Sequence, residues 1–487
     1  MRLHILAAAT GVALALAGCV SSGGLHPDGK LTDPGSLHAE RSLAGVTVSP
    51  AAWPSADWWT ALGDSQLDTL IVEALKSNPD LAIADARVRQ ASAQAGAADA
   101  ARSPTLGVGA SLAGARLPTS IAPKPVGGKF EWFKYGYGSF EWNPDLWGGK
   151  RDSWEAAVGA SRAAEIDARA ARIELSTAVA RAYAQLGYAF NLQDVAKAEL
   201  DRANQFRTLT LQRVHAGIDN KLQAKQTDTE VASAEERMAV AERAVDSART
   251  SLSVLLGQGP DRGLDIQRPQ VLKPATIAVP ADLPVDLLGR RADLVAARWR
   301  VESSSKEIDS AKADFMPNVS VMALAALIGG GSANIFNAAS EFYQVAPAIS
   351  LPIFDGGRRR AALAGKDAEY DLAVAQYNKI LVGALNEVAD DLDGLKSLNV
   401  QIEAQQRALD AATQAFDLAQ QRYKAGVGSY LESLTVREQL FVAERGVAEL
   451  NAQQVDLSVQ LIRALGGGFH ATEGDQPVAA APTNNKS

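Results

Sequence analysis

The chain has 487 residues, of which 47% are hydrophobic and 21% are charged, and its 48 basic and 56 acidic residues give a net charge of −8. This composition excludes a generally disordered protein, and the length predicts two or three structural units. No basic run or stripe occurs, which argues against nucleic acid as a partner. Aromatic residues make up only 6%, and alanine is abundant in long stretches that contain almost no proline. These features are typical of long, closely packed helices.

The first 19 residues have the pattern of a secretory signal. Arg2 precedes an apolar stretch over 5–16, which is too short to span a membrane, and small residues follow up to Cys19. The ending resembles the lipobox of bacterial lipoproteins, so we expect residues 1–18 to be removed and Cys19 to carry the lipid, including palmitate. Val20 favours sorting to the outer membrane, by resemblance to enterobacterial lipoproteins. The alternative is an ordinary signal with an incidental cysteine. Cys19 is the only cysteine, so no internal disulfide can form.

Three segments lack any sustained periodicity. Residues 19–55 are rich in Gly, Ser, Pro and Asp, and we interpret them as a lipidated tether whose first ordered contacts are made near Trp53. Residues 258–289 are dotted with proline and predict an extended linker. Residues 468–487 predict a disordered tail.

The remaining sequence is an internal duplication, with a first repeat over 56–257 and a second over 290–467. Asp80 and Pro104 have the same separation as Asp293 and Pro317. Further matches in register pair Trp147–Arg151 with Asp355–Arg359, Ala216–Ile218 with Ala425–Val427, and Leu255–Gly257 with Ala464–Gly466. Two copies in constant register predict two copies of one structural unit.

Each repeat predicts the same elements in the same order. The first repeat predicts a helix over about 65–101, two strands, a very long helix over about 152–214 and a shorter helix over about 219–256. The second repeat predicts a shorter first helix near 291–314, two strands, and helices over about 359–424 and 429–465. A glycine turn separates the last two helices of each repeat.

The long helix of the second repeat carries a coiled-coil pattern. Apolar residues recur every seven positions: Leu381, Val388, Leu395, Ile402, Leu409, Phe416 and Tyr423. The second seam position is apolar at Leu385 and Leu392 and later becomes polar or small, so the seam is narrow. A helix of about 65 residues reaches roughly 100 Å, a length that no compact globular domain needs.

The strand segments alternate apolar and small or polar residues. The first repeat has Leu106, Val108, Ala110 and Leu112, then Phe133, Tyr135, Tyr137, Phe140 and Trp142; the second has Val319, Val321, Ala323, Ala325 and Leu327, then Tyr343, Val345, Ile349 and Leu351. Runs of this length suit strands that cross an outer membrane, although a soluble sheet packed on one face fits equally well by itself. Four strands cannot close a barrel, and open edges are not tolerated in lipid. Membrane-spanning strands would therefore belong to a barrel shared between chains, and a conducting pore needs at least three chains and twelve strands.

Several motifs resemble the TolC family of outer-membrane efflux proteins, in particular its lipoprotein branch of NodT-like and OprM-like factors. They are Trp58-Trp59 with Leu62-Gly63-Asp64, Asn78-Pro79-Asp80-Leu81, Arg290-Arg291-Ala292-Asp293, Phe315-Met316-Pro317, Pro352-Ile353-Phe354-Asp355-Gly356-Gly357-Arg358, and Tyr423-Lys424-Ala425-Gly426-Val427. The likeness covers roughly 50–467. Ala292 stands where the family usually has proline, a difference expected to alter only the start of a helix.

The resemblance implies a mainly helical fold with a membrane β-barrel portion. Long coiled-coil helices would form an α-barrel in the periplasm, and four strands from each chain of a homotrimer would form a twelve-stranded barrel in the outer membrane. It further implies a periplasmic adaptor and an inner-membrane pump of the resistance-nodulation-division class as partners, with no cofactor and no enzymatic activity. The channel would be a passive exit duct for drugs, solvents or metals.

The resemblance places the functional sites at the turns between the long and short helices. The turns Gly217-Ile218-Asp219 and Gly426-Val427-Gly428 would be the tips that contact the adaptor, although glycine there also serves as an ordinary helix cap. Leu431 matches a gating leucine, Glu432 matches an acidic position of other members, and Thr435 replaces a common aspartate. We expect Leu431 and Glu432 to line the closed tip in three copies. The alternative for Glu432 is a solvated outer helix face.

Other functions find little support in the sequence. The histidines have no metal-site spacing such as HExxH, and Gly148-Gly149-Lys150 lacks the glycine and hydroxyl residue of a phosphate loop. Asp390, Asp391 and Asp393 favour a solvated helix face over a carboxylate pair. Two rival functions remain: a channel for type I protein secretion, whose members usually lack a lipid anchor, and a non-conducting periplasmic coiled-coil lipoprotein, which would not explain the strands.

Overall fold

The structure, a computed structural model, describes residues 22–38, 41–42, 53–121, 123–124, 127–274, 283–331 and 333–475. The expected signal peptide and Cys19 lie outside the described residues. The chain divides into two compact units. The strand unit comprises 1–31, 88–163 and 297–377, and the hairpin unit comprises 32–87, 164–296 and 378–487.

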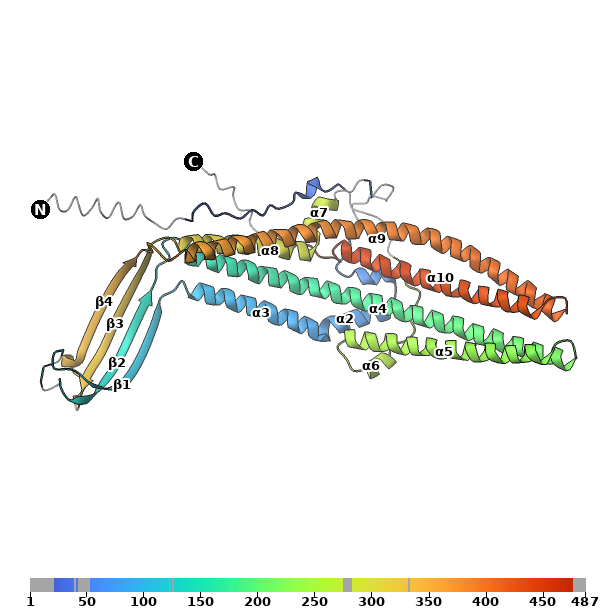
Figure 1. The fold of residues 1–487 in the computed structure, drawn as a ribbon, viewed down its shortest axis with the longest axis horizontal. Helices are drawn as coiled ribbons and strands as arrows, with labels where there is room; N and C mark the ends of the chain where they lie inside the picture. Colours follow the sequence, from blue (N-terminus) through green and yellow to red (C-terminus); the bar gives the residue numbers. More distant parts are fainter. Residues whose placement is uncertain are drawn as a thin grey trace. The chain divides into compact units, whose positions relative to one another are not determined.

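The two repeats contain matching elements (Figure 1). The first has α2 (Ser65–Ser77), α3 (Pro79–Ala100), β1 (Thr105–Arg116), β2 (Phe130–Trp142), α4 (Gly149–His215) and α5 (Lys221–Leu255), followed by the short α6 (Asp261–Leu264). The second has α7 (Leu283–Arg290), α8 (Ala292–Ala313), β3 (Asn318–Gly330), β4 (Glu341–Ser350), α9 (Arg358–Lys424) and α10 (Tyr430–Ala464). Equivalent helices have equal lengths: 22 residues in α3 and α8, 67 in α4 and α9, and 35 in α5 and α10.

Two predicted boundaries need correction. The expected helix over 65–101 is two helices, because Pro79 disfavours helical backbone in the preceding residue and Asn78 is extended, with ψ 128°. The Asn78 side chain then accepts a hydrogen bond from the N–H of Asp80 at 2.7 Å and donates one to the Leu255 carbonyl at 2.8 Å. The expected linker over 258–289 contains the short helix α6 and ends in α7, so it is not extended throughout.

The four strands form one antiparallel sheet in the order β1-β2-β3-β4, with β1 and β4 at open edges. The register places Leu106, Phe140, Ala323 and Val345 side by side on one face. This face is apolar; in the single chain it is strongly exposed on the two edge strands, with Leu106 at 81% and Val345 at 73%, and partly exposed at Phe140 and Ala323. Phe133, Tyr135 and Tyr137 lie on the opposite face from Phe140 and Trp142, because side chains alternate along a strand. The aromatic run of β2 thus serves both faces of the sheet.

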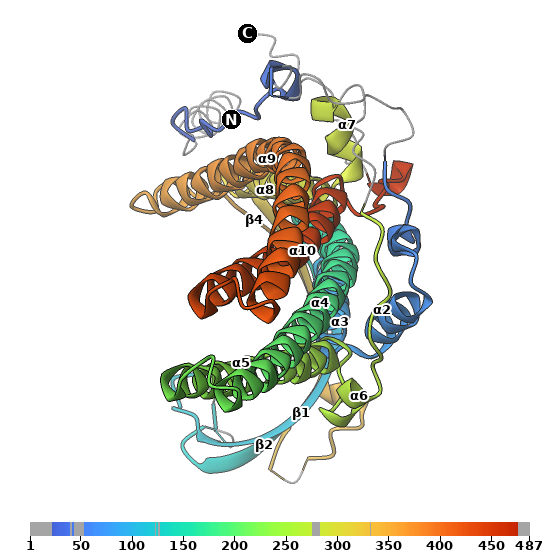
Figure 2. The same ribbon diagram turned by 90° about the vertical axis from the view of Figure 1, so that its right-hand side faces the viewer.

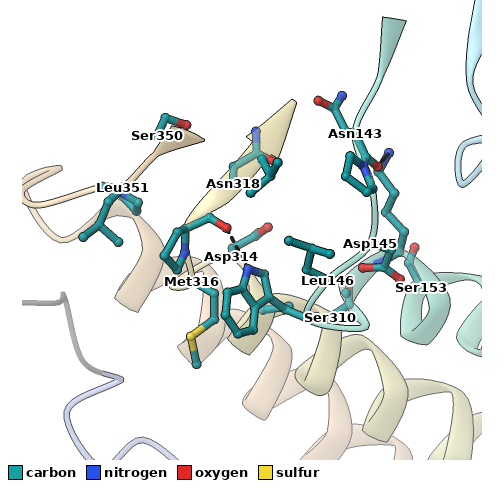
Figure 3. Close-up of a pocket in the computed structure, with 18 of the residues that line it drawn as sticks. Asn143, Asp145, Leu146, Ser153, Ser310, Asp314, Met316, Asn318, Ser350 and Leu351 are labelled. Carbon is teal, nitrogen blue, oxygen red and sulfur yellow. Dashed lines mark hydrogen bonds between the residues drawn. The ribbon is translucent and has the colours of Figure 1, made fainter. Parts of the chain in front are cut away.

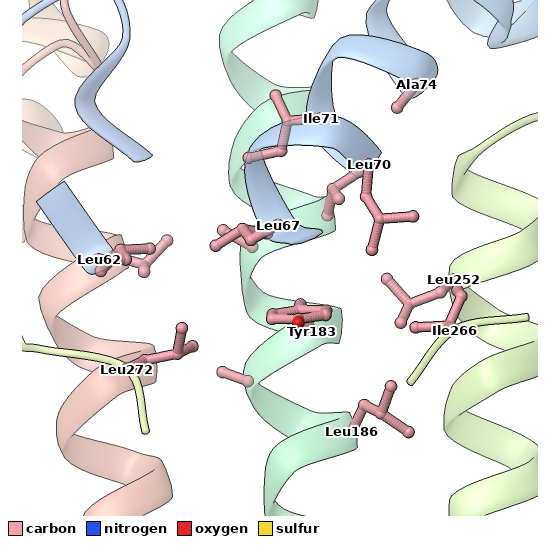
Figure 4. Close-up of a cluster of buried hydrophobic side chains, with 14 of the residues drawn as sticks. Leu62, Leu67, Leu70, Ile71, Ala74, Tyr183, Leu186, Leu252, Ile266 and Leu272 are labelled. Carbon is pink, nitrogen blue, oxygen red and sulfur yellow. The ribbon is translucent and has the colours of Figure 1, made fainter. Parts of the chain in front are cut away.

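The core of the hairpin unit lies where α2 crosses α4 and α5 (Figure 4). Its fully buried members include Leu67, Ile71, Tyr183 and Leu252. Tyr183 carries the one polar group among them, and its hydroxyl donates to the Asp64 carboxylate at 2.7 Å. Asp64 also caps α2 by accepting from the N–H of Gln66, so a single carboxylate joins the helix start to the core.

Glycines at equivalent positions end the last helix of each repeat. Gly257 has φ +68° and Gly466 has φ +96°, values that disfavour any residue with a side chain. A Cβ atom at Gly466 would lie 1.9 Å from the Arg290 carbonyl oxygen, and one at Gly257 would lie 2.6 Å from the Ser77 carbonyl oxygen. In both repeats, therefore, the chain before the 22-residue helix packs directly on glycine.

The end segments are more ordered than the sequence predicts. Leu25, in the expected tether, packs against a buried cluster of Ile308, Phe315 and Leu363. In the expected disordered tail, Phe469 is 7% exposed and the carboxylate of Asp475 accepts two hydrogen bonds from the guanidinium of Arg169. The tail prediction is therefore wrong for the residues up to Asp475. Ordered contacts also begin well before Trp53.

A cavity of about 710 Å³ lies in the strand unit where the strands meet the helices. Its wall includes Asn143, Leu146 and Met316, and Asp314 lies among them (Figure 3). The indole N–H of Trp147 donates to the Pro317 carbonyl at 2.7 Å and so joins the first repeat to the second. Among the described residues, no helix is both long enough and apolar enough to cross a membrane.

Candidate functional site

The α4–α5 and α9–α10 turns, which face the viewer in Figure 2, share one backbone design. In the α4–α5 turn, Gly217 has φ +73°, its N–H donates to the Val214 carbonyl, and the N–H of Ile218 donates to the Arg213 carbonyl. In the α9–α10 turn, Gly426 has φ +79°, and the same two bonds run from Gly426 to Tyr423 and from Val427 to Arg422. Both are Schellman caps, which require the left-handed conformation that glycine supplies. The prediction of two equivalent glycine turns is confirmed.

The helices that follow the turns start in the same way. Asn220 accepts from the N–H of Gln223, whose side chain accepts in return from the N–H of Asn220 at 2.7 Å. In the second turn, Ser429 and Glu432 form the same capping box, at 3.0 and 3.5 Å. Glu432 therefore has a structural role as a cap, and Gln223 occupies the equivalent position in the first repeat.

One buried polar network connects the first tip to the second hairpin. The guanidinium of Arg213 donates to the two carboxylate oxygens of Asp219 at 2.8 and 3.3 Å and to the Tyr423 carbonyl at 2.7 Å. The Tyr423 hydroxyl donates to the same carboxylate at 2.6 Å, and the guanidinium lies 4.3 Å from the centre of the Tyr423 ring. Thr210 completes the network with a hydroxyl contact to Tyr423 at 3.2 Å.

The network determines the charge states of its members. Burial by itself would raise the pKa of the Asp219 carboxyl, but the hydrogen bonds from Arg213 and Tyr423 outweigh it and hold that pKa below its usual value. Burial and the adjacent Asp219 carboxylate raise the pKa of the Tyr423 phenol. At neutral pH the network therefore contains a carboxylate, a guanidinium and a neutral phenol. Phe206 and Tyr430 pack beside it, with ring centres 5.5 Å apart.

The predicted gate residues lie directly after the second turn. Leu431 is 68% exposed, and the Thr435 hydroxyl, one helical turn further on, donates to the Leu431 carbonyl. Glu432 pairs with Arg422 of its own chain, with 3.3 Å between Nε and Oε1 and both side chains about half exposed. The structure thus brings the three gate candidates together on the first turns of α10, and their contribution to a pore remains a prediction.

The two tips differ mainly in the position of their acid. Arg213 and Arg422 occupy equivalent positions, two residues before the end of the long helix. In the first tip the arginine pairs with Asp219 in the turn, and its side chain is 10% exposed. In the second tip Gly428 replaces that acid, and the arginine pairs with Glu432, leaving its own side chain 56% exposed. The first tip therefore holds its ion pair inside and the second presents it to solvent.

A second ion-pair network lies deeper between the hairpins. Glu199 of α4, only 1% exposed, contacts Arg437 of α10 at 3.2 Å and Arg202 at 3.3 Å. Arg437 also pairs with Glu230 of α5, and Arg202 forms two hydrogen bonds with Glu444. Burial raises the pKa of Glu199 despite the neighbouring arginines. These residues fasten α4, α5 and α10 to one another.

Several of these residues could not be identified from the sequence. Tyr423 is an exception, because the sequence places it at the last position of the heptad seam. Nothing in the pattern, however, pairs Tyr423 with Arg213. A groove of about 880 Å³ between α9 and α10 also went unpredicted; alanines form much of its wall, including Ala408, Ala412 and Ala415, and Thr435 lies at its edge.

The acidic cluster on α9 also needs correction. Asp390 and Asp393 are exposed as expected, but Asp391 is only 8% exposed, and burial raises its pKa to about 6. In the described part of the chain, no group of three or more His, Cys, Asp or Glu residues could hold a metal ion.

Comparisons with known proteins agree with this architecture. The family described as "Outer membrane efflux protein" matches residues 70–258 and again residues 283–467, one match for each repeat. The fusaric acid resistance protein FusA of Burkholderia cepacia is 35% identical over 361 residues, which are 73% of this chain and 68% of that protein. The multidrug resistance outer membrane protein MdtP of Escherichia coli K12 is 29% identical over 88% of this chain and 89% of its own length.

A solved structure extends the agreement to the fold. The outer membrane protein VceC of Vibrio cholerae is 34% identical and superimposes with a TM-score of 0.80, covering 86% of this chain and all of VceC. Structures of this kind combine an α-helical barrel with a β-barrel that three chains share, which confirms the predicted fold class. The four-stranded sheet described here is one chain's portion of that barrel, and the chain is an outer-membrane channel for efflux. The chain belongs to the outer membrane efflux protein family.

Proposed function

We propose that this channel is a passive exit duct for small molecules, gated at the tip of the second repeat and performing no chemistry itself. Members of the family work as trimers with adaptor and pump partners. For this chain we propose a periplasmic adaptor at the two tips and a pump of the resistance-nodulation-division class, with lipid attached at Cys19. The observation that supports a gate at the second tip is the difference between the two tips. Their backbones are alike, but the acid Asp219 is buried in the first tip and the acid Glu432 is exposed in the second.

The argument for the gate starts from exposed side chains. Leu431 and Glu432 project from the first turn of α10 without being covered by their own chain, since Leu431 is 68% exposed and the Glu432 side chain is 41% exposed. In a trimer each position occurs three times. A ring of leucines narrows a pore and excludes water, and a ring of carboxylates concentrates cations. The partial pairing of Glu432 with Arg422 weakens the negative potential of the carboxylate ring.

The tips also supply the surface proposed for the adaptor. Ile218 and Val427, at the crest of the two turns, are 63% and 69% exposed, and Leu222 is 66% exposed. The turn backbones need only the glycines, so these apolar side chains contribute little to the fold. Exposed apolar side chains at the end of a rigid hairpin suit a helical partner.

The names of the relatives suggest the substrate class. FusA is named for fusaric acid resistance and MdtP for multidrug resistance. We propose low-molecular-weight toxic compounds as substrates of this chain. Deleting the gene and measuring sensitivity to a panel of drugs, solvents and metal salts would test this, and unchanged sensitivity to every compound would contradict it.

Single-channel recording in planar bilayers tests the gate with two opposite changes. Glu432→Gln removes the charge while keeping the cap, because glutamine already makes this capping box at Gln223. We expect it to lower cation selectivity and polycation block. Arg422→Gln removes the partner of Glu432 and should raise both. Glu438→Gln, which removes an acid further along α10, is the matched control. If neither of the first two variants differs from Glu438→Gln, Glu432 does not line the pore.

A further inference from the structure

The amino-terminal segment lies along α9 in a defined register. We call residues 22–32 the strap. Leu25 packs on the buried cluster to which α9 contributes Leu363, and the N–H of Gly29 donates to the carboxylate of Asp371 at 2.6 Å. Four residues of extended chain span about 13 Å, and the eight helical residues from Leu363 to Asp371 rise about 12 Å. The strap and the helix thus advance together, with about two helical residues for each residue of the strap.

The fit at Gly29 leaves no room for a side chain. A Cβ atom there would lie 2.9 Å from a carboxylate oxygen of Asp371 and 3.1 Å from the Cβ of Val374. Further along, the N–H of Thr32 donates to the side-chain oxygen of Asn378 at 2.8 Å. Both hydrogen bonds therefore join a backbone N–H of the strap to a side chain of α9. A strap shifted along the helix would bring a residue with a side chain to the place that only Gly29 fits.

Asp367 lies between the two contact points, one helical turn from each. It is 6% exposed, and neither carboxylate oxygen has a hydrogen-bond partner among the described residues. The charged groups that face it come from three elements: His26 and Asp28 from the strap, Lys312 from α8 and Asp371 from α9 itself. Lys312 is already paired with Asp309 at 3.5 Å. The seated strap therefore lies close to a buried carboxyl group that accepts no hydrogen bond from the described residues.

We propose that seating of the strap on α9 is linked to protonation of Asp367: the strap covers the neutral carboxyl and is released when the group ionises. An ionised carboxylate without a partner is costly to bury, whereas a neutral carboxyl is much less so. His26 and Asp28 place the strap close to Asp367, so releasing the strap is the simplest way to hydrate the charge.

The direction of the pH dependence follows from the same contacts. Burial, aided by Asp371 and Asp28 and opposed by Lys312 and His26, raises the pKa of Asp367 above 3.8. The seated state thus binds a proton more tightly than the released state. Seating is strongest at low pH and weakens as pH rises through the pKa of the seated state.

The consequence concerns the amino-terminal anchor. Leu25 lies six positions after Cys19, where we expect the lipid, and this stretch can span at most about 20 Å. Release of the strap up to Thr32 would add seven residues, or at most about 25 Å of free chain. Seating at low pH would therefore hold the channel on a short tether, and release at higher pH would lengthen the tether.

Hydrogen–deuterium exchange of the full-length trimer in detergent tests the proposal. Protection of the Gly29 and Thr32 amides is measured from pH 3.5 to pH 8, a range that starts below the ordinary pKa of an aspartate, and is corrected for the intrinsic pH dependence of exchange. We expect protection to fall as pH rises, by up to tenfold per pH unit, the limit for one linked proton. Asp367→Asn should make protection independent of pH. His26→Gln should keep the wild-type slope, and Asp371→Asn should lower protection while keeping the slope.

The proposal would be overturned if protection in the wild type did not depend on pH, or if Asp367→Asn kept the wild-type dependence of protection on pH. Gly29→Leu provides a second test if Asp367→Asn does not assemble. Its side chain prevents seating, so the strap should exchange freely at every pH. A wild-type slope in Gly29→Leu would mean that the titration does not act through seating.

Discussion

Replacing Asp219 by asparagine should loosen the connection between the first tip and the second hairpin. The substitution keeps the size of the side chain but removes the charge that holds Arg213 through two hydrogen bonds and Tyr423 through a third. Breaking a buried ion pair costs about 3–5 kcal/mol. Here Arg213 keeps its bond to the Tyr423 carbonyl and its contact with the ring, so we expect about 2 kcal/mol.

A change of that size corresponds to about 30-fold more frequent local opening, because about 1.4 kcal/mol is a factor of ten. Hydrogen–deuterium exchange of peptides covering 210–225 and 420–434 measures it directly, at a pH where exchange reports on opening equilibria. Asp228→Asn is the control, since Asp228 pairs with Arg207 on the exposed surface of the same hairpin and should change protection much less. Equal effects of the two variants, or no effect of Asp219→Asn, would refute the reasoning.

Three further predictions follow from buried groups elsewhere. Asp391→Asn should stabilise the trimer, because burial raises the pKa of this carboxyl from 3.8 to about 6, a destabilisation of about 3 kcal/mol at most when the group is ionised. This penalty is absent below about pH 4 and fully present above about pH 6, so the apparent Tm should rise at pH 8 and not at pH 4. Gly466→Ala should abolish assembly, because its Cβ would lie 1.9 Å from the Arg290 carbonyl oxygen; normal trimer yield on size-exclusion chromatography would contradict this. A chain that ends before Phe469 should lose several degrees of apparent Tm relative to one that ends after Asp475, since it lacks a buried ring and an ion pair with Arg169.

The regular elements could be predicted because their signals are local and repeated. Heptads determine the course of α9, where Leu381, Val388 and Leu395 are almost fully buried and Ile402 and Leu409 are half buried, as the narrowing seam predicts. Proline and glycine mark the ends of helices and strands. The duplication strengthens each of these predictions, because every element is expected at the matching place in both repeats.

The remaining contacts could not be predicted because they depend on residues far apart in sequence. Tyr423 and Asp219 are 204 positions apart, and Gly29 and Asp371 are 342 apart. The strap has no apolar periodicity, because its docking uses backbone N–H groups, and a single glycine gives no pattern. The burial of Asp391 could not be predicted for a related reason: an acidic run on a helix is usually solvated, and the burial of one member depends on helices that the sequence pattern does not position.

The equal lengths of the paired helices limit how such a channel can change. Both long helices contain 67 residues, about 100 Å each, and both short partners contain 35. Inserting a heptad in α9 and α10 alone would carry one tip about 10 Å past the other and break the Arg213–Tyr423 contact. A longer or shorter tunnel would therefore need matched insertions or deletions in both halves of the gene, so its length can evolve only in paired steps.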